Sequence, residues 1–517
     1  MNEQQYRSLC EACDRVLLAP DSTMERVAIP WLHIIREHPV FLANYADLFE
    51  PAGGIHALFA KRQRTFRNRA GWFRQLLRSI RADGQPWYGP EKLQNGIDIL
   101  FVSHLLNSSH AGQSHDFYFG RLPDDLVKHG HSVAIALINH SGQAPGPLAD
   151  KWKESALTRV ILSESLRFRE EMDLRRRLRK ESFYLRILAD AATPGLARRV
   201  ADRASEEAVS GGSLTTLRMA KQIGSLVAAM KPKAIVLTHE GHSWERVAFA
   251  AARKAVPEVQ CIGYQHAALF RLQHAIRRNL AAEYNPGHIV TAGAVAKGQL
   301  DRAPRLNGIP ISVLGSNRTL SVEKGAQQDA GSNRIGSIDR LACLVLPEGI
   351  ASECHLLFEF SLACARSRPE IQFIWRLHPI LSFKSLAAKN KNLRNLPRNI
   401  SLSQAMLEED IARCSWALYR GTTAVVQAVV AGLRPLYLQM PDELIVDPLY
   451  ELAAWRKSIN SVEDFCSVTQ SGRSAPFLDE EAEFREAERY CRDFFTPLNP
   501  QALESITSVT ILGRETK

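Results

Sequence analysis

The chain has 517 residues, of which 45% are hydrophobic and 23% charged, with a formal net charge of +10 and a pI of about 9.2. This length exceeds one hydrophobic core and predicts two or three domains of an ordinary soluble protein. No apolar run approaches the roughly 20 residues that span a bilayer, and Met1 to Ala19 lack a signal-peptide core. The nine cysteines are scattered. Cys10 and Cys13 form a lone C-x-x-C without further metal ligands nearby, so the sequence indicates reduced thiols, no metal site and a cytoplasmic protein.

Residues 1–92 predict a helical accessory region without strands. Within it, residues 61–81 contain eight basic side chains and no acidic ones. Phe66, Phe73, Leu77 and Ile80 recur there at helical spacing. A basic amphipathic helix of this kind either lies on an anionic membrane surface or presents a solvated face, and the sequence leaves both open. No nucleic-acid-binding motif is recognisable, so we expect no nucleic-acid partner.

Residues 93–320 predict a Rossmann-like, doubly wound domain, because short apolar strands alternate with helices. The expected strands cover residues 97–102, 132–138, 234–237, 261–264, 289–291 and 311–314, and helices are expected at 117–128 and 243–255. A helical insertion is expected at about 150–230. It contains the basic run Arg175 to Lys180, which we interpret as a solvated helix face. Residues 317–340 are rich in Gly, Ser, Gln and Asn and indicate a linker.

A second Rossmann-like domain is expected at residues 335–475, followed by C-terminal helices at 476–517. Its predicted strands cover residues 341–346, 371–377, 400–402, 416–419 and 435–438, with helices at 352–366, 404–413 and 422–431. Two such domains in tandem, facing a cleft and preceded by a helical extension, form the outline of an α/β protein of the GT-B class. The outline alone does not fix a function.

Three short polar motifs follow strands of the second domain. Glu348 and Gly349 follow the first, Arg376, His378 and Pro379 the second, and a third group follows the strand that ends at Tyr419. This third group is Arg420, Gly421, Thr422 and Thr423. The carboxyl ends of parallel strands are where open α/β sheets bind ligands, so the three motifs predict a nucleotide site.

The chemistry of these residues suits a nucleotide. His378 is placed to hydrogen-bond a phosphate oxygen, and Thr422 and Thr423 open a helix whose amides and dipole favour an anion. Glu348 can accept hydrogen bonds from a base amino group or a ribose hydroxyl. Taken singly, each residue also fits an ordinary capping or turn role.

The order Glu-Gly, His-Pro, Thr-Thr resembles bacterial GT-B enzymes that use CMP-activated ulosonic acids, namely sialyltransferases and Kdo transferases of capsule, O-antigen and lipopolysaccharide assembly. The blocks Thr238 to Arg246 and Gly263 to His266 resemble surface-carbohydrate O-ketoside transferases. The resemblance implies that Glu348 contacts cytidine, whereas His378, Thr422 and Thr423 contact phosphate. Pro347 stands where those families carry a second acidic residue.

Glycosyl transfer needs a carboxylate that acts as a base on the acceptor, or as a nucleophile in a retaining enzyme. Glu240, at the end of the strand 234–237, is the first candidate, and Asp116 is the second. Either could instead cap a helix, and Glu245 is expected to be a solvated helix residue. His266 follows another strand and could bind the donor carboxylate or serve a structural role. CMP is a tolerable leaving group without a metal, so we expect neither metal nor cofactor besides the CMP-sugar.

The predicted function is therefore a CMP-sugar glycosyltransferase acting on a polysaccharide or a lipid-linked glycan. The expected location is the cytoplasm, or the inner surface of a bacterial membrane if residues 61–81 bind lipid. Three alternatives stay open: a UDP-sugar 2-epimerase, a CDP-glycerol-type glycerophosphotransferase, and a non-catalytic scaffold of polysaccharide assembly.

Overall fold

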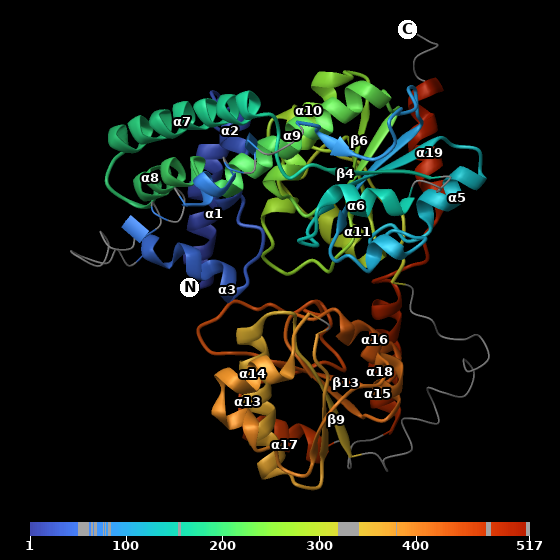
Figure 1. Ribbon diagram of the computed structural model, residues 1–517. Helices are drawn as coiled ribbons and strands as arrows, with labels where there is room; N and C mark the ends of the chain where they lie inside the picture. Colours follow the sequence, from blue (N-terminus) through green and yellow to red (C-terminus); the bar gives the residue numbers. More distant parts are fainter. Residues whose placement is uncertain are drawn as a thin grey trace. The chain divides into compact units, whose positions relative to one another are not determined.

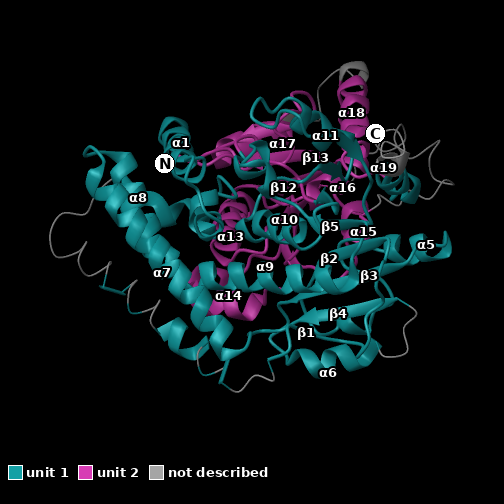
Figure 2. Ribbon diagram, turned by 90° about the horizontal axis from the view of Figure 1, so that it is seen from above, with its two compact units in different colours: residues 1–266, 273–317, 497–517 teal, residues 267–272, 318–496 magenta. Residues whose placement is uncertain are grey.

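A computed structural model describes residues 1–49, 62, 63, 66, 70–75, 77, 79, 80, 84–152, 157–318, 341–378, 380–471 and 477–512. The chain forms two compact units (Figure 2). Unit 1 comprises residues 1–266, 273–317 and 497–517, and unit 2 comprises residues 267–272 and 318–496. Each unit is built on one sheet (Figure 1). The expected fold class, an α/β chain with two Rossmann-like domains and an N-terminal helical extension, is confirmed.

The sheet of unit 1 has eight strands in the order β1-β4-β3-β2-β5-β6-β7-β8. All neighbouring strands are parallel except β1, which pairs antiparallel with β4. The strands are β1 (Trp87–Tyr88), β2 (Ile99–Leu105), β3 (Val133–Asn139), β4 (Thr158–Leu162), β5 (Ala234–Thr238), β6 (Gln260–Gln265), β7 (His288–Thr291) and β8 (Ile311–Val313).

Alternate residues of the strands supply two separate cores, one on each face of this sheet. Ile99 and Phe101 of β2 belong to one core, whereas Leu100 and Val102 belong to the other, as the two-residue repeat of a strand requires. The first core includes residues of α5 (Leu122–Lys128), α6 (Pro145–Ala149) and α19 (Pro500–Leu512). The second includes residues of α9 (Gly211–Met230) and α10 (Ser243–Ala255). Because helices cover both faces, the strands are mostly apolar.

The N-terminal extension is an integral part of unit 1. It contains α1 (Glu3–Leu17), α2 (Met24–Val27) and α3 (Pro39–Leu42). The carboxylate of Asp14, in α1, pairs with His274 at 2.9 Å, Arg278 at 2.8 Å and Arg305 at 3.0 Å. The expectation that residues 1–92 contain no strand is wrong, because β1 lies there.

Within the range of the expected helical insertion, the helices are α7 (Phe168–Ala191), α8 (Leu196–Ala208) and α9. The start of this insertion was placed too early, because β4 lies within the range 150–230. Buried ion pairs hold α7 to its surroundings, such as that between Arg26 and Glu181 at 2.7 Å. Most of the expected linker and nine of the residues 61–81 lie outside the described residues.

The sheet of unit 2 has six parallel strands in the order β11-β10-β9-β12-β13-β14. They are β9 (Ala342–Leu346), β10 (Gln372–Trp375), β11 (Ile400–Leu402), β12 (Trp416–Tyr419), β13 (Arg434–Leu438) and β14 (Lys457–Ile459). The helices are α13 (Ala351–Ser367), α14 (Phe383–Lys389), α15 (Leu407–Ala412), α16 (Ala424–Val430), α17 (Val462–Ser471) and α18 (Phe477–Arg492). In this unit the sequence analysis missed β14, α14 and α17. It also grouped the last helices together, whereas α18 belongs to unit 2 and α19 to unit 1.

In the part of the chain that the structure describes, no helix combines the length and apolarity needed to cross a membrane.

Candidate functional site

Each sheet has a point at which the direction of strand addition reverses. In unit 1 the chain builds outward from β2 through β3 to β4 and then returns to add β5 on the other side of β2. In unit 2 it builds from β9 through β10 to β11 and returns to add β12 beside β9. The crevice outside the carboxyl ends of the strands at such a switch point is where ligands bind in open α/β sheets. The residues of interest in each unit lie at these points.

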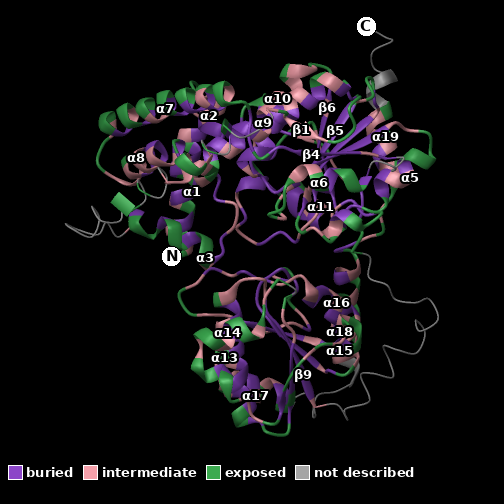
Figure 3. Cartoon of the chain, viewed as in Figure 1, coloured by how far each residue is buried: buried purple, intermediate pink, exposed green. Residues whose placement is uncertain are grey.

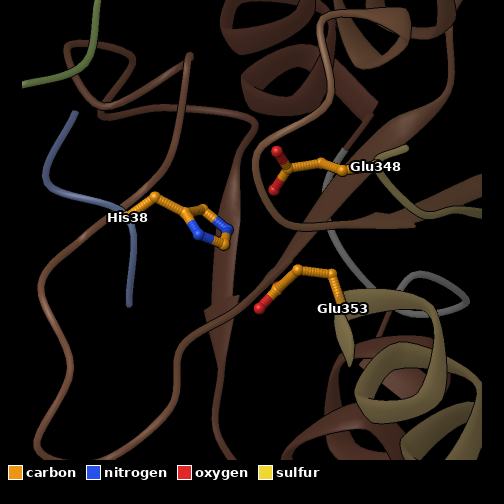
Figure 4. A group of neighbouring side chains, drawn as sticks. All are labelled: His38, Glu348 and Glu353. Atoms are coloured by element: carbon orange, nitrogen blue, oxygen red, sulfur yellow. The ribbon is translucent and has the colours of Figure 1, made fainter. Parts of the chain in front are cut away.

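The switch point of unit 2 brings Glu348 and Gly421 together. Glu348 follows β9, and Gly421 follows β12, which pairs with β9. A Cβ atom at Gly421 would overlap the carboxylate of Glu348, which would then have to move aside. A carboxylate oxygen of Glu348 and one of Glu353, in the first turn of α13, lie within 4.8 Å of each other (Figure 4). His38, also labelled there, belongs to unit 1.

His378 comes from the neighbouring strand β10 and lies beside Gly349. A Cβ atom at Gly349 would lie 3.1 Å from Nδ1 of His378, again a close approach to glycine. This Nδ1 accepts a hydrogen bond from the amide of Ile380 at 3.4 Å, which leaves the proton of the neutral ring on Nε2. Partial burial and the charge of Arg318 lower the pKa of His378, against the opposing effect of Glu348. The exposed ring therefore presents an Nε2–H donor.

The structure assigns Arg420 and Arg376 partners within the protein. Arg420 is 2% exposed and pairs with Glu353 at 3.3 Å and Glu443 at 2.6 Å, and these carboxylates raise its pKa despite burial. Arg376 pairs with Asp410 at 2.8 Å. Both residues belong to the motifs that predicted the nucleotide site. In the structure they anchor the loops that follow β12 and β10. Pro379 lies outside the described residues.

The two threonines lie at the start of α16, which begins later than expected. Thr423 is its N-cap residue, and Oγ1 of Thr422 accepts a hydrogen bond from the amide of Ala424 at 3.3 Å. The helix has seven residues, so we assign no anion site to its N-terminus alone.

In unit 1, Glu240 follows β5 and is 8% exposed. Its carboxylate lies 3.0 Å from Nη2 of Arg36 and 3.4 Å from Nε2 of His242. Burial alone would raise the pKa of Glu240, but the charge of Arg36 and the hydrogen bond of His242 hold it well below its usual value. Glu240 is therefore an ionised carboxylate held in a polar setting, and it does not cap α10, whose N-cap residue is His242.

Glu245 organises the loop that carries Glu240. Its carboxylate accepts hydrogen bonds from the amides of Glu240, Gly241 and His242 at 2.8 to 3.1 Å and contacts His239 at 2.9 Å. Glu245 is 1% exposed, so the expectation of a solvated helix residue is wrong. The carboxylate folds back over the start of α10 because the amides there have no partner within the helix.

Gly241 and Arg246 fix the other side of this loop. Gly241 has a φ of +89°, and a Cβ atom there would overlap the backbone of Ala275. Buried Arg246 donates to the carbonyl oxygens of Ala275 and Arg278 at 2.9 and 3.0 Å. The block Thr238 to Arg246 is thus a rigid platform for Glu240.

A histidine network that the sequence analysis missed lies beside Glu240. Nδ1 of His104, on β2, is 2.9 Å from Nε2 of His140, and its Nε2 is 3.1 Å from Oγ1 of Thr238. Burial lowers the pKa of His104 to about 3, assisted by the neighbouring histidines, so its ring is neutral. The sequence could have indicated this network, because His104 and His140 stand at strand ends. Arg36 gave no local signal.

The other two catalytic candidates differ in their surroundings. Oδ1 of Asp116 accepts hydrogen bonds from Oγ of Ser103 and from the amides of Tyr118 and Phe119, each at 2.8 Å. These amides belong to the turn at residues 117–119, and the N-cap residue of α5 is Arg121, so Asp116 holds a turn and does not cap a helix. His266 follows β6 and packs against the ring of Tyr118 at 4.5 Å. Its charge helps to lower the pKa of Glu240, so it belongs to the same cluster.

Comparisons with known proteins give likeness of fold only. No family model and no curated protein matches the chain. Among solved structures, a putative UDP-N-acetylglucosamine 2-epimerase from Listeria monocytogenes aligns with a TM-score of 0.45 and 12% identity, over 81% of this chain and 98% of that one. A glycosyltransferase from Rickettsia africae aligns with a TM-score of 0.44 and 11% identity, over 81% and 99%. A glycosyltransferase from Streptomyces nogalater aligns with a TM-score of 0.39 and 16% identity, over 81% and 100%. The function is therefore argued from the residues of the site.

Proposed function

We propose that the protein is a glycosyltransferase that moves an ulosonic acid, Kdo or a sialic-acid-like sugar, from a CMP-sugar to a carbohydrate acceptor. The observation that carries this proposal is the convergence of Glu348, His378 and Gly421 on three adjacent strand ends of unit 2, at its switch point. An acceptor for base or ribose hydrogens and a donor for phosphate are the groups that a nucleotide requires.

In this proposal His378 stabilises the leaving group. Its Nε2–H donates to a phosphate oxygen of CMP as negative charge develops there, and preorganised donors of this kind supply a large share of catalysis in dry sites. Glu348 accepts hydrogen bonds from the nucleoside. Arg376, Arg420 and Thr422 hold the surrounding loops in place.

Glu240 is the proposed base in unit 1. The oxygen of an acceptor hydroxyl forms a bond to the anomeric carbon, the bond from that carbon to the phosphate oxygen breaks, and CMP departs with the electron pair. The proton of the hydroxyl passes to Glu240. An ionised carboxylate is the required starting state, and the pairing of Glu240 with Arg36 supports it.

The deciding experiment compares nucleotides and donors on the full chain. Thermal stabilisation should be larger with CMP than with UDP at equal concentration, since a ligand that binds only the native state raises the unfolding free energy. Release of CMP from CMP-Kdo or CMP-sialic acid should then require an acceptor. Stabilisation by UDP alone, with interconversion of a UDP-sugar, would instead identify the epimerase alternative.

We further propose that the acceptor is lipid-linked and that the enzyme works on the inner surface of a bacterial membrane. The basic composition of residues 61–81 supports this proposal. Among its described apolar residues, Phe66 is 73%, Phe73 55% and Ile80 62% exposed.

A further inference from the structure

A pocket lies among the helices of unit 1. It has a volume of about 740 Å³ and lies between α7, the end of α8, the start of α9 and described residues of the N-terminal extension, namely Phe66 and residues 70–75. Its apolar lining comes from Phe66, Trp72, Phe73, Leu178, Val209 and Leu214. This size and this lining are typical of sites for small organic ligands.

Helical periodicity explains why α7 presents two different faces. Arg175, Leu178, Arg179, Ser182 and Arg186 recur every three to four residues and line the pocket. The other face of α7 is largely exposed (Figure 3). It carries Arg176, Lys180, Phe183 and Ile187, of which Phe183 is 68% and Ile187 48% exposed. The sequence analysis interpreted the basic run as a solvated helix face. The structure differs, because Arg175 and Arg179 of this run line the pocket.

Arg175 is the distinctive residue of the pocket, because it is a buried cation that forms no ion pair with any described acidic residue. It is 4% exposed, and its Nε and Nη1 have no hydrogen-bond partner among the described residues. Its Nη2 donates to the carbonyl oxygen of Trp72 at 3.2 Å, and its guanidinium lies 4.4 Å from the centre of the Trp72 ring. Burial lowers the pKa of Arg175 to about 10, partly offset by Glu171.

Three nearby carboxylates already pair with other arginines. Glu171 is held by Arg218 at 3.1 Å, Glu181 by Arg26 at 2.7 Å and Glu207 by Arg203 at 2.9 Å. Glu206, Arg179 and Arg186 also line the pocket. A buried charge normally requires a partner of opposite sign. The unmet requirement at Arg175 points to an anionic group supplied by a ligand.

We propose that this pocket binds an anionic amphiphile, with its apolar chain against Phe66, Phe73 and Leu214 and its phosphate near Arg175. Exposed apolar side chains at the rim, Phe66 and Phe73, suit a ligand that arrives from a lipid phase. The inference does not rest on the proposed glycosyltransferase activity, since the pocket shares no residue with the candidate sites of either unit.

The test titrates the full chain with dodecyl phosphate below its micelle concentration, using isothermal calorimetry. Dodecyl maltoside has the same chain with a neutral head, and inorganic phosphate lacks the chain. We expect saturable one-to-one binding of dodecyl phosphate and at least about tenfold weaker binding of both comparators. Equal affinity for dodecyl maltoside, or no binding of dodecyl phosphate, would overturn the proposal.

Variants separate ligand binding from a merely structural role of Arg175. Arg175→Gln should weaken dodecyl phosphate binding about tenfold, Arg175→Lys should restore part of it, and Arg176→Gln, on the exposed face one residue away, should leave it unchanged. Leu214→Trp fills the pocket and should abolish binding even if Arg175→Gln fails to fold. If Arg175→Gln lowers the melting temperature but binds dodecyl phosphate normally, Arg175 only clamps Trp72 and the proposal is wrong.

A vesicle experiment distinguishes the two sources of such a ligand. Sedimentation with phosphatidylglycerol vesicles but not phosphatidylcholine vesicles, weakened by Arg175→Gln, would support a ligand held in a bilayer. Binding of dodecyl phosphate without vesicle binding would support a lipid phosphate that the protein takes up from solution.

Discussion

The guanidinium of Arg36 lies 3.0 Å from a carboxylate oxygen of Glu240, although the two residues are 204 positions apart in the chain. This pair joins the N-terminal extension to the carboxyl end of β5. The charge of Arg36 helps to keep the pKa of Glu240 well below its usual value, although burial favours the protonated form. The extension thus contributes directly to the electrostatics of the candidate site.

Replacing Arg36 with alanine should make the activity more sensitive to acid. Without the cation, burial raises the pKa of Glu240, so the carboxylate that must be ionised is protonated at a higher pH. The acid limb of the pH dependence of CMP release should move upward, and the activity lost at pH 5 should exceed that lost at pH 8. Arg7→Ala, at an exposed arginine paired with Glu3, is the control. If the pH profiles of CMP release have the same shape for wild type and Arg36→Ala, then Arg36 does not control the ionisation of Glu240.

Glu240→Gln should abolish sugar transfer while CMP affinity stays close to wild type. Glutamine keeps the shape of the side chain but cannot accept the proton, and a general base typically contributes about 10² to 10⁴ in rate. Calorimetric titration with CMP and an assay of transfer supply the two measurements. Glu283→Gln, at an exposed site of the same unit, is the matched control. A comparable loss of CMP affinity would mark Glu240 as structural.

The strands could be predicted because they are buried apolar runs bounded by polar turns. The expected strands at 400–402 and 416–419 coincide with β11 and β12, as the helix expected at 243–255 does with α10. The edge strands β1 and β14 could not be predicted. β1 has two residues, and β14, Lys457–Ile459, has one apolar residue, so neither shows a periodic pattern.

The polar motifs at strand ends were also readable, since the position of a residue after a parallel strand fixes its edge of the sheet. Ion-pair partners that come from distant segments of the chain could not be predicted. No sequence pattern links Arg36 to Glu240. Likewise, no pattern around Arg420 predicted its ion pairs with Glu353 and Glu443. Glu245 stands three residues after the N-cap of α10, the spacing of a capping box, but the cap is His242 rather than Ser or Thr.

Glu245→Ala should destabilise unit 1 strongly. Three amides, those of Glu240, Gly241 and His242, would lose their shared acceptor, and each buried unsatisfied donor costs about 1 to 3 kcal/mol. Glu245→Gln keeps one acceptor oxygen and should fall between alanine and wild type. Chemical denaturation followed by circular dichroism measures the change. A free energy of unfolding within error of wild type would show that this loop does not need Glu245.

Gly421→Ala should weaken nucleotide binding without unfolding the protein. The new methyl group would overlap the Glu348 carboxylate, which must then move from the position proposed to read the nucleoside. We expect a loss of about tenfold in CMP affinity, the effect of one charged hydrogen bond. Gly112→Ala, where a Cβ atom meets nothing within 4 Å, is the matched control. Unchanged CMP affinity in Gly421→Ala would place Glu348 outside the nucleotide site.

His378→Ala should lose most of the turnover, because it removes the proposed donor to the leaving phosphate. Removing such a donor from a water-excluded site typically costs about 2 to 4 kcal/mol of transition-state stabilisation, or roughly 30-fold to 1,000-fold in rate. The melting temperature should hardly change, since the ring is exposed and its one hydrogen bond, from the amide of Ile380, is long at 3.4 Å. His378→Gln, which can still donate from a side-chain amide, should recover part of the rate. CMP release measured under saturating donor tests all three forms, and near-normal release by His378→Ala would remove the histidine from the mechanism. If both variants lose turnover equally and also lose thermal stability, His378 supports the β10 loop rather than the reaction.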